Sequence, residues 1–363
     1  MKIPVYNNGY KNRPLQYNIN KNINNIEYDR RKLIYDDPII FWGSHHKTGT
    51  YVGQKLFSSI CANMKNLCCI NLVTRDSIHF VNHILSSEPI NVLGHSQWIW
   101  YPENFNRTSY KFVHFYRHPY RKIISGYLYH QKGIEGWTQS SLNYSRVCDE
   151  KLINQKNLDR ITVVEYCSGI HLCQGCCRKE HETGDKNNPY QSRNKLEYEF
   201  ICKTLGQVDT SIQNKLQQLP LKEGLRLEAS LDYYENLRMI KLASHTWNDP
   251  NTLNINLDDL ALDFKNIINK ILNHINPNGN QKEMNKIAQE LYFYDAENSY
   301  IYRAINNLFS PDHIHSRSQR EQNVENYSKI LQEDEEITKL YEPIFELYEK
   351  LAVEKIKHKS LDT

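Results

Sequence analysis

The segment from Ile39 to Tyr51 constrains the fold of this chain most, because it joins an apolar stretch to a polar turn and then to an amphipathic stretch. The four residues Ile39–Trp42 are typical of a buried strand. After the turn, apolar residues recur at every fourth position, which predicts a helix with one apolar face: Val52, Leu56, Ile60 and Met64. A strand, a short polar turn and a helix in this order indicate an α/β fold.

The turn itself, Ser44 to Thr50, has the composition of an anion-binding loop. The first N–H groups of a helix and its dipole attract anions, and Gly49 lets the backbone approach one closely. Lys47 adds a charge, and Thr48 and Thr50 add hydroxyl donors. Lys47 precedes Gly49, whereas a Walker A loop places its lysine directly after the second glycine, so an ordinary NTPase is disfavoured. The loop alone leaves open a simple capped turn with an exposed lysine.

A second strand and helix favour the anion site over the simple turn. Lys111–Tyr116 is typical of a strand, and the helix predicted after it continues through Leu128. Arg117 would therefore lie at a carboxyl end, where ligands bind in open α/β sheets, and could face the same crevice as Lys47. A guanidinium suits bidentate phosphate binding, and Ser125 on the helix could add a donor.

At these two motifs the chain resembles the sulfotransferases that use 3′-phosphoadenosine 5′-phosphosulfate (PAPS). Their 5′-phosphosulfate loop is matched by His46-Lys47-Thr48-Gly49-Thr50, and their Arg-x-Pro and Ser-x-Tyr motif by Arg117-His118-Pro119 and Ser125-Gly126-Tyr127. Val52 stands where many members have Trp, and His118 replaces the usual Asp or Asn. A weaker likeness extends over residues 216–225 and 257–260, so the resemblance covers most of residues 37–350.

The resemblance implies a P-loop-like, doubly wound parallel sheet flanked by helices, with PAPS as sulfuryl donor. It also implies a set of donor-binding residues: His46, Lys47, Thr48, Gly49, Thr50, Tyr51, Arg117, Ser125 and Arg317. The family places a loop over the 3′-phosphate in the last third of the chain, which corresponds here to the basic segment 313–320 around Arg317. A solvated basic turn is the alternative interpretation of that segment.

His95 is the predicted general base, because the family carries a histidine at the end of a core strand between the two motifs, and residues 90–93 fit such a strand. A neutral imidazole can take the acceptor's proton near neutral pH. Lys47 would stabilise charge on the leaving phosphate oxygen. His45 and His46 are rivals as base, but both are better suited to orienting the loop or contacting phosphate.

Composition is compatible with a cytoplasmic enzyme that binds neither nucleic acid nor membrane. The chain has 363 residues, a formal net charge of +3 and a pI near 8.2. It has no apolar run approaching the roughly 20 residues that span a bilayer, and its N-terminal residues are polar where a signal peptide would be apolar. Residues 1–36 predict a poorly ordered arm, and residues 37–363 a single domain.

Residues 140–205 predict an insertion or lid, and they hold six of the nine cysteines. Cys173 and Cys176, with neighbouring thiols and His181, could bind zinc, although a single C-x-x-C is a weak signal. Local disulfides are a second alternative, and free thiols are favoured, so we expect no metal. The last third predicts helices over residues 262–275, with Leu262 on the apolar face, and over 333–355.

The sequence therefore predicts a PAPS-dependent sulfotransferase that acts on a hydroxyl, or less readily an amine, of a small-molecule or carbohydrate acceptor. A non-catalytic nucleotide-binding or zinc-dependent interaction module on the same fold is the alternative, and a kinase is a third. Aromatic residues that could line an acceptor pocket are Trp98, Trp100, Tyr101, Trp137 and Trp247.

Overall fold

The computed structural model describes residues 38–63, 69–72, 91–95, 101–102, 105, 109–133, 136–139, 210–277, 279–292 and 317–361. The predicted arm (1–36), most of the predicted insertion (140–205), with its candidate zinc ligands, and Trp98 and Trp100 lie outside these residues.

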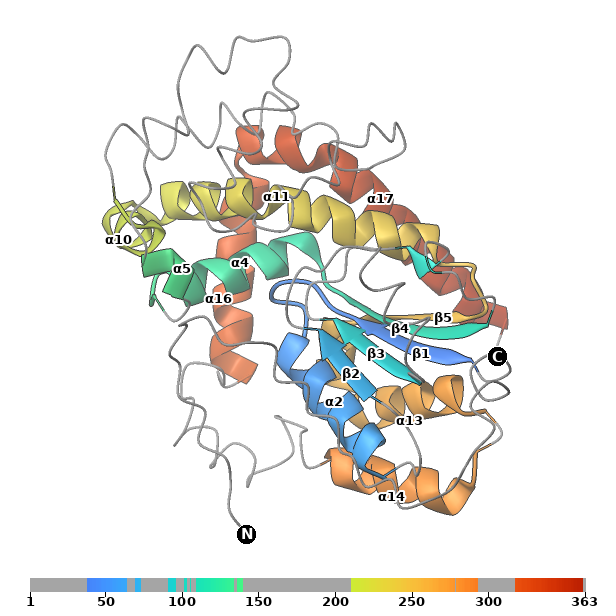
Figure 1. The fold of residues 1–363 in the computed structure, drawn as a ribbon. Coiled ribbons are helices and arrows are strands. Elements are labelled where there is room, and N and C mark those ends of the chain that lie inside the picture. Colours follow the sequence, from blue (N-terminus) through green and yellow to red (C-terminus); the bar gives the residue numbers. More distant parts are fainter. Residues whose placement is uncertain are drawn as a thin grey trace.

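The described residues form an α/β fold built on one five-stranded, all-parallel sheet (Figure 1). Its strand order is β2-β3-β1-β4-β5, so β1 lies in the middle. The predicted parallel α/β architecture is confirmed. The strands are β1 (Ile39–Gly43), β2 (Cys69–Leu72), β3 (Val92–His95), β4 (Tyr110–Tyr116) and β5 (Thr252–Asn256).

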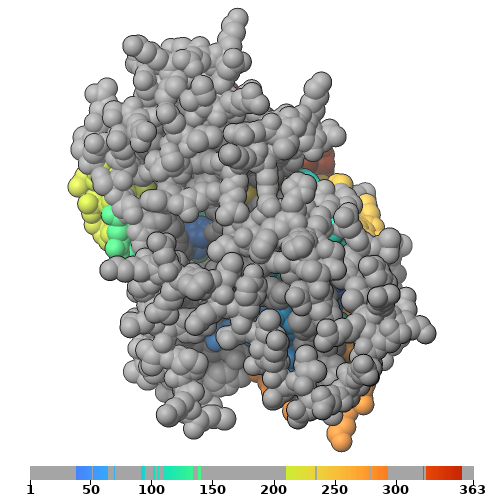
Figure 2. All heavy atoms as spheres, in the orientation of Figure 1, coloured from blue at the N-terminus to red at the C-terminus, as the bar shows by residue number. Residues whose placement is uncertain are grey.

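Helices cover both faces of this sheet. One face packs against α2 (Thr50–Asn63), α13 (Phe264–Ile275) and α14 (Gln281–Tyr292), and the other against α4 (Pro119–His130), α11 (Leu221–His245) and α17 (Glu335–Leu361) (Figure 1). The remaining helices are α5 (Gly136–Gln139), α10 (Ile212–Gln218), α12 (Leu257–Leu262) and α16 (Arg317–Gln332). In the same view, Figure 2 shows α10 and α5 at one edge of the molecule and α14 at the opposite edge.

Each face of the sheet has its own apolar core, as the alternation of side chains along a strand requires. Trp42, Val113 and Ile255 pack with the helices on the α2 side, whereas Tyr116 joins the core formed by α4, α11 and α17. Both phosphate-motif helices, α2 and α4, are therefore fixed by extensive apolar burial, each on its own side of the sheet.

Two predictions about the last third need correction. Leu262 was expected on an apolar helical face, but it is 62% exposed, because α12 ends there and Asp263 breaks the helix with φ −140° and ψ 59°. Arg317 was expected in a loop, but it is the first residue of α16. The helix predicted over residues 333–355 corresponds to α17, whose buried face includes Ile337, Tyr341 and Ile344.

A disulfide joins Cys61 in α2 to Cys69 in β2. The sequence did not predict this bond, and it does not support the expected cytoplasmic location, because structural disulfides are typical of oxidising compartments. Among the described helices, none combines the length and apolarity that crossing a bilayer requires.

Candidate anion-binding site

The β1–α2 loop, residues 44–49, leaves the carboxyl end of the central strand, and Arg117 leaves the carboxyl end of the neighbouring strand β4. Strand β1 has β3 on one side and β4 on the other. The chain runs from β1 to β2 on the β3 side and later crosses from β3 to β4 on the opposite side of β1. This is the switch point at which open parallel sheets bind ligands. The two motifs predicted from sequence therefore meet here, although they are about 70 residues apart.

The loop folds around the backbone N–H and carbonyl groups of His45. The His45 N–H donates to Thr48 Oγ1 (2.6 Å), and the His45 carbonyl accepts from the Thr48 N–H (3.0 Å), from Thr48 Oγ1 (2.8 Å) and from Thr50 Oγ1 (3.3 Å). Ser44 Oγ lies 3.0 Å from Thr50 Oγ1. Thr48 is buried, so its predicted hydroxyl donor serves the loop's own fold.

Lys47 and Gly49 have left-handed backbone conformations, with φ of 59° and 84°. Lys47 is the one non-glycine residue with positive φ among those the structure describes. Such strain, of about 1–3 kcal/mol, is concentrated at functional sites. Alternating handedness along a turn is typical of concave backbone sites that bind anions. The φ of Gly49 is one that side chains other than glycine rarely adopt, and a Cβ there would also come within 2.8 Å of the Leu257 side chain, which would have to shift.

Below the loop, an uncharged chain of hydrogen bonds runs from His45 to residues of β4 and β5. His45 Nε2 lies 2.9 Å from His114 Nε2, and His114 Nδ1 lies 2.7 Å from Asn254 Oδ1. The Asn254 amide donates to Thr246 Oγ1 (3.2 Å), so its oxygen must face His114. His114 therefore carries its proton on Nδ1 and accepts at Nε2, and His45 carries its proton on Nε2.

This arrangement requires both imidazoles to be neutral at the loop. Burial lowers the pKa of His114 to about 4, although its bond to Asn254 acts in the opposite direction. Burial lowers the pKa of His45 well below its ordinary value, and His114 adds to that effect. His45 Nδ1 is left as a buried acceptor with no hydrogen-bond partner among the described residues.

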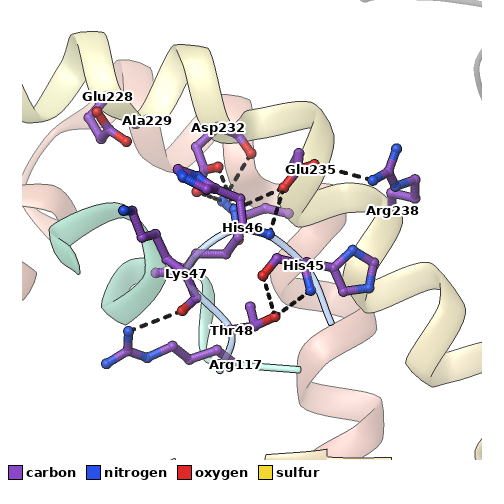
Figure 3. Close-up of polar contacts among 12 residues, drawn as sticks. His45, His46, Lys47, Thr48, Arg117, Glu228, Ala229, Asp232, Glu235 and Arg238 are labelled. Atoms are coloured by element: carbon purple, nitrogen blue, oxygen red, sulfur yellow. Dashed lines mark hydrogen bonds and ion pairs between the residues drawn. The ribbon is translucent and has the colours of Figure 1, made fainter. Parts of the chain in front are cut away.

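Above the loop, α11 and α4 contribute a charged network (Figure 3). Lys122, whose side chain is fully buried, pairs with Asp232 and lies 3.8 Å from Glu235. Glu235 accepts from the His46 N–H (3.1 Å) and pairs with Arg238 (3.2 Å). Burial raises the pKa of Asp232 to about 7, and the charge of Lys122 partly offsets this.

The side chains of Lys47 and His46 both lie against the last turn of α4. Lys47 Nζ is 3.0 Å from the centroid of the Tyr129 ring, so it is a cation–π contact and not the fully exposed lysine of the simple-turn interpretation. The His46 ring stacks on His130 with centroids 5.1 Å apart, and His130 is paired with buried Glu228 (2.9 Å). The side chains of His46 and Lys47 are thus oriented by α4.

Arg117 is buried and holds two parts of the protein together. Its Nε pairs with Asp258 (3.3 Å), and its Nη1 donates to the Lys47 carbonyl (3.4 Å). Arg121 also lies near Asp258, at 3.6 Å. Arg117 therefore fixes the strained Lys47 residue from the β4 side.

The position of His118 explains why a histidine can replace the Asp or Asn of the resembled motif. Its side chain accepts from the Tyr120 N–H (3.2 Å) and caps the N-terminus of α4, as Asp or Asn does at such positions. Ser125 lies half-buried on the same helix. A Cβ on Gly126 would meet Glu228 Oε1 at 2.1 Å, so the motif's glycine makes room for that carboxylate.

His95 is the last residue of β3, and its Cα is paired in register with Gly43, the last residue of β1. Its backbone therefore adjoins the start of the anion loop. The side chains of His95, Tyr51, Trp137 and Arg317 lie outside the described part of the chain. Trp247 is partly buried against the core on the α11 side.

Sequence reasoning missed His114, Asn254, Lys122, Asp232, Glu235 and Arg238. A signal was present in α11, where Glu228, Asp232 and Glu235 recur at helical spacing on one side of the helix. No group of side chains within the described residues could hold a metal ion.

Comparisons with known proteins give little support beyond this geometry. No protein-family model matches the chain, and no curated protein matches it either. One of the similar solved structures is mouse sulfotransferase SULT7A1 complexed with PAP. The alignment covers 85% of this chain and 89% of that one, with 13% identity and a TM-score of 0.34, which is too low to establish a common fold.

Proposed function

We propose that the protein is a sulfotransferase that transfers a sulfuryl group from PAPS to a hydroxyl, or less readily an amine, of a small-molecule or carbohydrate acceptor. The observation that carries this proposal is the β1–α2 loop, in which Lys47 is held in a left-handed conformation at the N-terminus of α2. Its order of Lys before Gly separates it from a Walker A loop. Its sequence, and that of the Arg117 motif, match the PAPS-binding pattern.

The donor's 5′-phosphosulfate would bind at the loop, through residues 46–51 and the charge of Lys47. Lys47 would leave Tyr129 to neutralise the leaving phosphate oxygen, which needs only a side-chain rotation because the loop is preformed. The 3′-phosphate would bind at Arg117 and Ser125, with Arg317 as a further contact. Binding there would require Arg117 to exchange part of its contact with Asp258 for the phosphate.

His95 would be the general base. It would take the proton of the acceptor oxygen as that oxygen attacks sulfur in line, while the bond from sulfur to the phosphate oxygen breaks. The position of its Cα next to Gly43 supports this role, because a side chain at that edge starts within reach of the loop.

Nucleotide binding gives the first test. We expect 3′-phosphoadenosine 5′-phosphate to raise the melting temperature clearly more than ADP does, because only the former carries a 3′-phosphate. Equal shifts would remove the 3′-phosphate site from the proposal. A shift without turnover of labelled PAPS, in a screen of hydroxyl and amine acceptors, would favour a nucleotide-binding module instead.

Two substitutions then test the assigned roles. Lys47→Ala should lower kcat by about 100- to 1,000-fold, as loss of one preorganised charge donor does. The control Lys339→Ala, at an exposed lysine, should not lower kcat.

His95→Asn should lower kcat by about 100-fold or more with nucleotide binding retained. His274→Asn, at the amino edge of the sheet beside Asn251, is the matched control. Full activity of His95→Asn would move the base to His45, His46 or a carboxylate of the predicted insertion.

A further inference from the structure

Three acidic residues of α11 face the anion loop and α4, and all three are largely buried. Glu228, Asp232 and Glu235 are four and three residues apart, so they share one side of the helix (Figure 3). Negative charge beside a site for an anion repels the anion unless nearby positive charge compensates it. Glu228 is paired with His130, and Asp232 with Lys122. Glu235 differs from both because it also contacts the loop.

Glu235 is the acidic residue of this set that contacts the backbone of the loop. Its Oε2 accepts from the His46 N–H at 3.1 Å, and the same oxygen lies 3.8 Å from Lys122 Nζ. Its Oε1 accepts from Arg238 at 3.2 Å. Two cations with nearly buried side chains therefore fix and neutralise the carboxylate, and the carboxylate in turn fixes the residue that precedes Lys47.

This contact decides which end of the loop is offered to a ligand. The His46 N–H is committed to Glu235 and the Thr48 N–H to the His45 carbonyl. These two N–H groups at the entry of the loop are thus satisfied from within the protein, so an anion would be bound by Lys47 and the N-terminus of α2. A hydrogen bond to a charged acceptor is stronger than one to a neutral group, so Glu235 can hold the loop against the strain at Lys47.

We propose that Glu235 is a positioning residue, which holds the entry of the anion loop so that Lys47 and the α2 N-terminus are already arranged when the donor nucleotide binds. The consequence for binding rests on the proposed function, whereas the effect on the loop does not. Lys122 and Arg238 serve the same end, because they cancel the charge that would otherwise repel the nucleotide's phosphates.

Amide hydrogen exchange at His46, measured by NMR in the nucleotide-free protein, tests the effect on the loop. In Glu235→Ala the exchange should accelerate about tenfold or more, as expected when a hydrogen bond to a charged group is lost. Glu235→Gln keeps an acceptor oxygen and should retain most of the protection, and it also serves if the alanine variant does not fold. Asp232→Asn is the matched control, because Asp232 shares Lys122 but makes no hydrogen bond to the loop. Unchanged His46 exchange in both Glu235 variants, or an equal change in Asp232→Asn, would overturn the proposal.

Nucleotide measurements on the same variants separate this inference from the proposed function. In Glu235→Ala the Kd for 3′-phosphoadenosine 5′-phosphate and the KM for PAPS should both rise about tenfold, with a smaller change in kcat, since loop order is needed before the nucleotide binds. If the wild-type protein binds no nucleotide while His46 exchange still responds to Glu235→Ala, the proposed function fails and the positioning role stands. If nucleotide binding is unaffected while exchange responds, the role in donor binding is wrong.

Discussion

The two sides of the anion loop are held by opposite kinds of chemistry. On the strand side, His45, His114 and Asn254 form a chain of neutral hydrogen bonds. On the helix side, Lys122 and Glu235 belong to a network of buried charges. Only one placement of the protons satisfies every hydrogen bond of the neutral chain, so its stability depends on the direction of each hydrogen bond. The stability of the charged network depends on the balance of positive and negative charges, because each buried charge is tolerated only with its partner.

This difference shows how the loop can be kept rigid without adding net charge beneath the anion that we propose it binds. Neutral imidazoles hold the loop from below without attracting or repelling a phosphate, and the cations of the helix side cancel the carboxylates above it. Substitutions on the two sides should therefore change the free energy of unfolding by different amounts. The contributions of the two sides to that free energy should change in opposite directions with pH.

Removing the central cation should give the largest effect. Lys122→Met removes the buried cation of Asp232 and leaves Glu235 with Arg238 alone, and breaking a buried ion pair such as Lys122–Asp232 costs about 3–5 kcal/mol in the free energy of unfolding. Urea unfolding measures this loss. The double variant Lys122→Met/Asp232→Asn should recover part of it, because one uncompensated carboxylate is gone. A cost of Lys122→Met no larger than that of the exposed Lys339→Met would show that the helix side does not depend on charge balance.

Breaking the neutral chain should cost less. His114→Leu leaves the His45 Nε2–H and Asn254 Oδ1 buried without their partner, at about 1–3 kcal/mol in the free energy of unfolding. His114→Gln can donate to Asn254 and accept from His45, so it should lose clearly less. Equal losses for the leucine and glutamine variants would indicate that packing, and not hydrogen-bond direction, holds the strand side.

The pH dependence should have opposite signs on the two sides. The pKa of His114 is depressed from 6.5 to about 4, so its contribution to stability is present above pH 6.5 and is lost as the pH falls toward 4. The pKa of Asp232 is raised from 3.8 to about 7, so its contribution is present below pH 3.8 and is lost as the pH rises toward 7. Each slope is at most about 1.4 kcal/mol per pH unit.

Urea titrations between pH 4 and pH 7.5 separate these two contributions. His114→Gln should gain stability relative to wild type as the pH falls, and Asp232→Asn should gain relative to wild type as the pH rises. Parallel profiles for the two variants would contradict the assignment of a neutral and a charged side.

Sequence patterns predicted the elements whose character is local. The strand Ile39–Trp42, the helix around Leu56 and Ile60, and the turn between them have hydrophobic periods and glycine positions that can be read within about ten residues. Arg117 could be placed at a strand end for the same reason. Leu262 was misassigned because hydrophobic periodicity continues across Asp263, where the backbone leaves the helix.

The contacts that hold the site could not be predicted in this way. Glu235 lies 189 residues from His46, and the partner of His114 on β5 lies 140 residues further along the chain. Such pairs are created by the packing of α11 over the sheet and by the strand order, neither of which a local pattern specifies. The pairing of Arg117 with Asp258 has the same origin, because the two residues are 141 positions apart.

The long separation of these contacts has a consequence for how the protein is made. During synthesis the β1–α2 loop is complete once about residue 63 has emerged, but the strand that carries Asn254 and the helix that carries Glu235 follow nearly 200 residues later. The nascent loop therefore meets His114 and Arg117 first and must wait for Glu235 and Asn254. All-parallel sheets with distant pairings fold slowly and leave strand edges exposed meanwhile. We expect chains that stall before β5 to be degraded or to aggregate without ever forming the loop's left-handed Lys47.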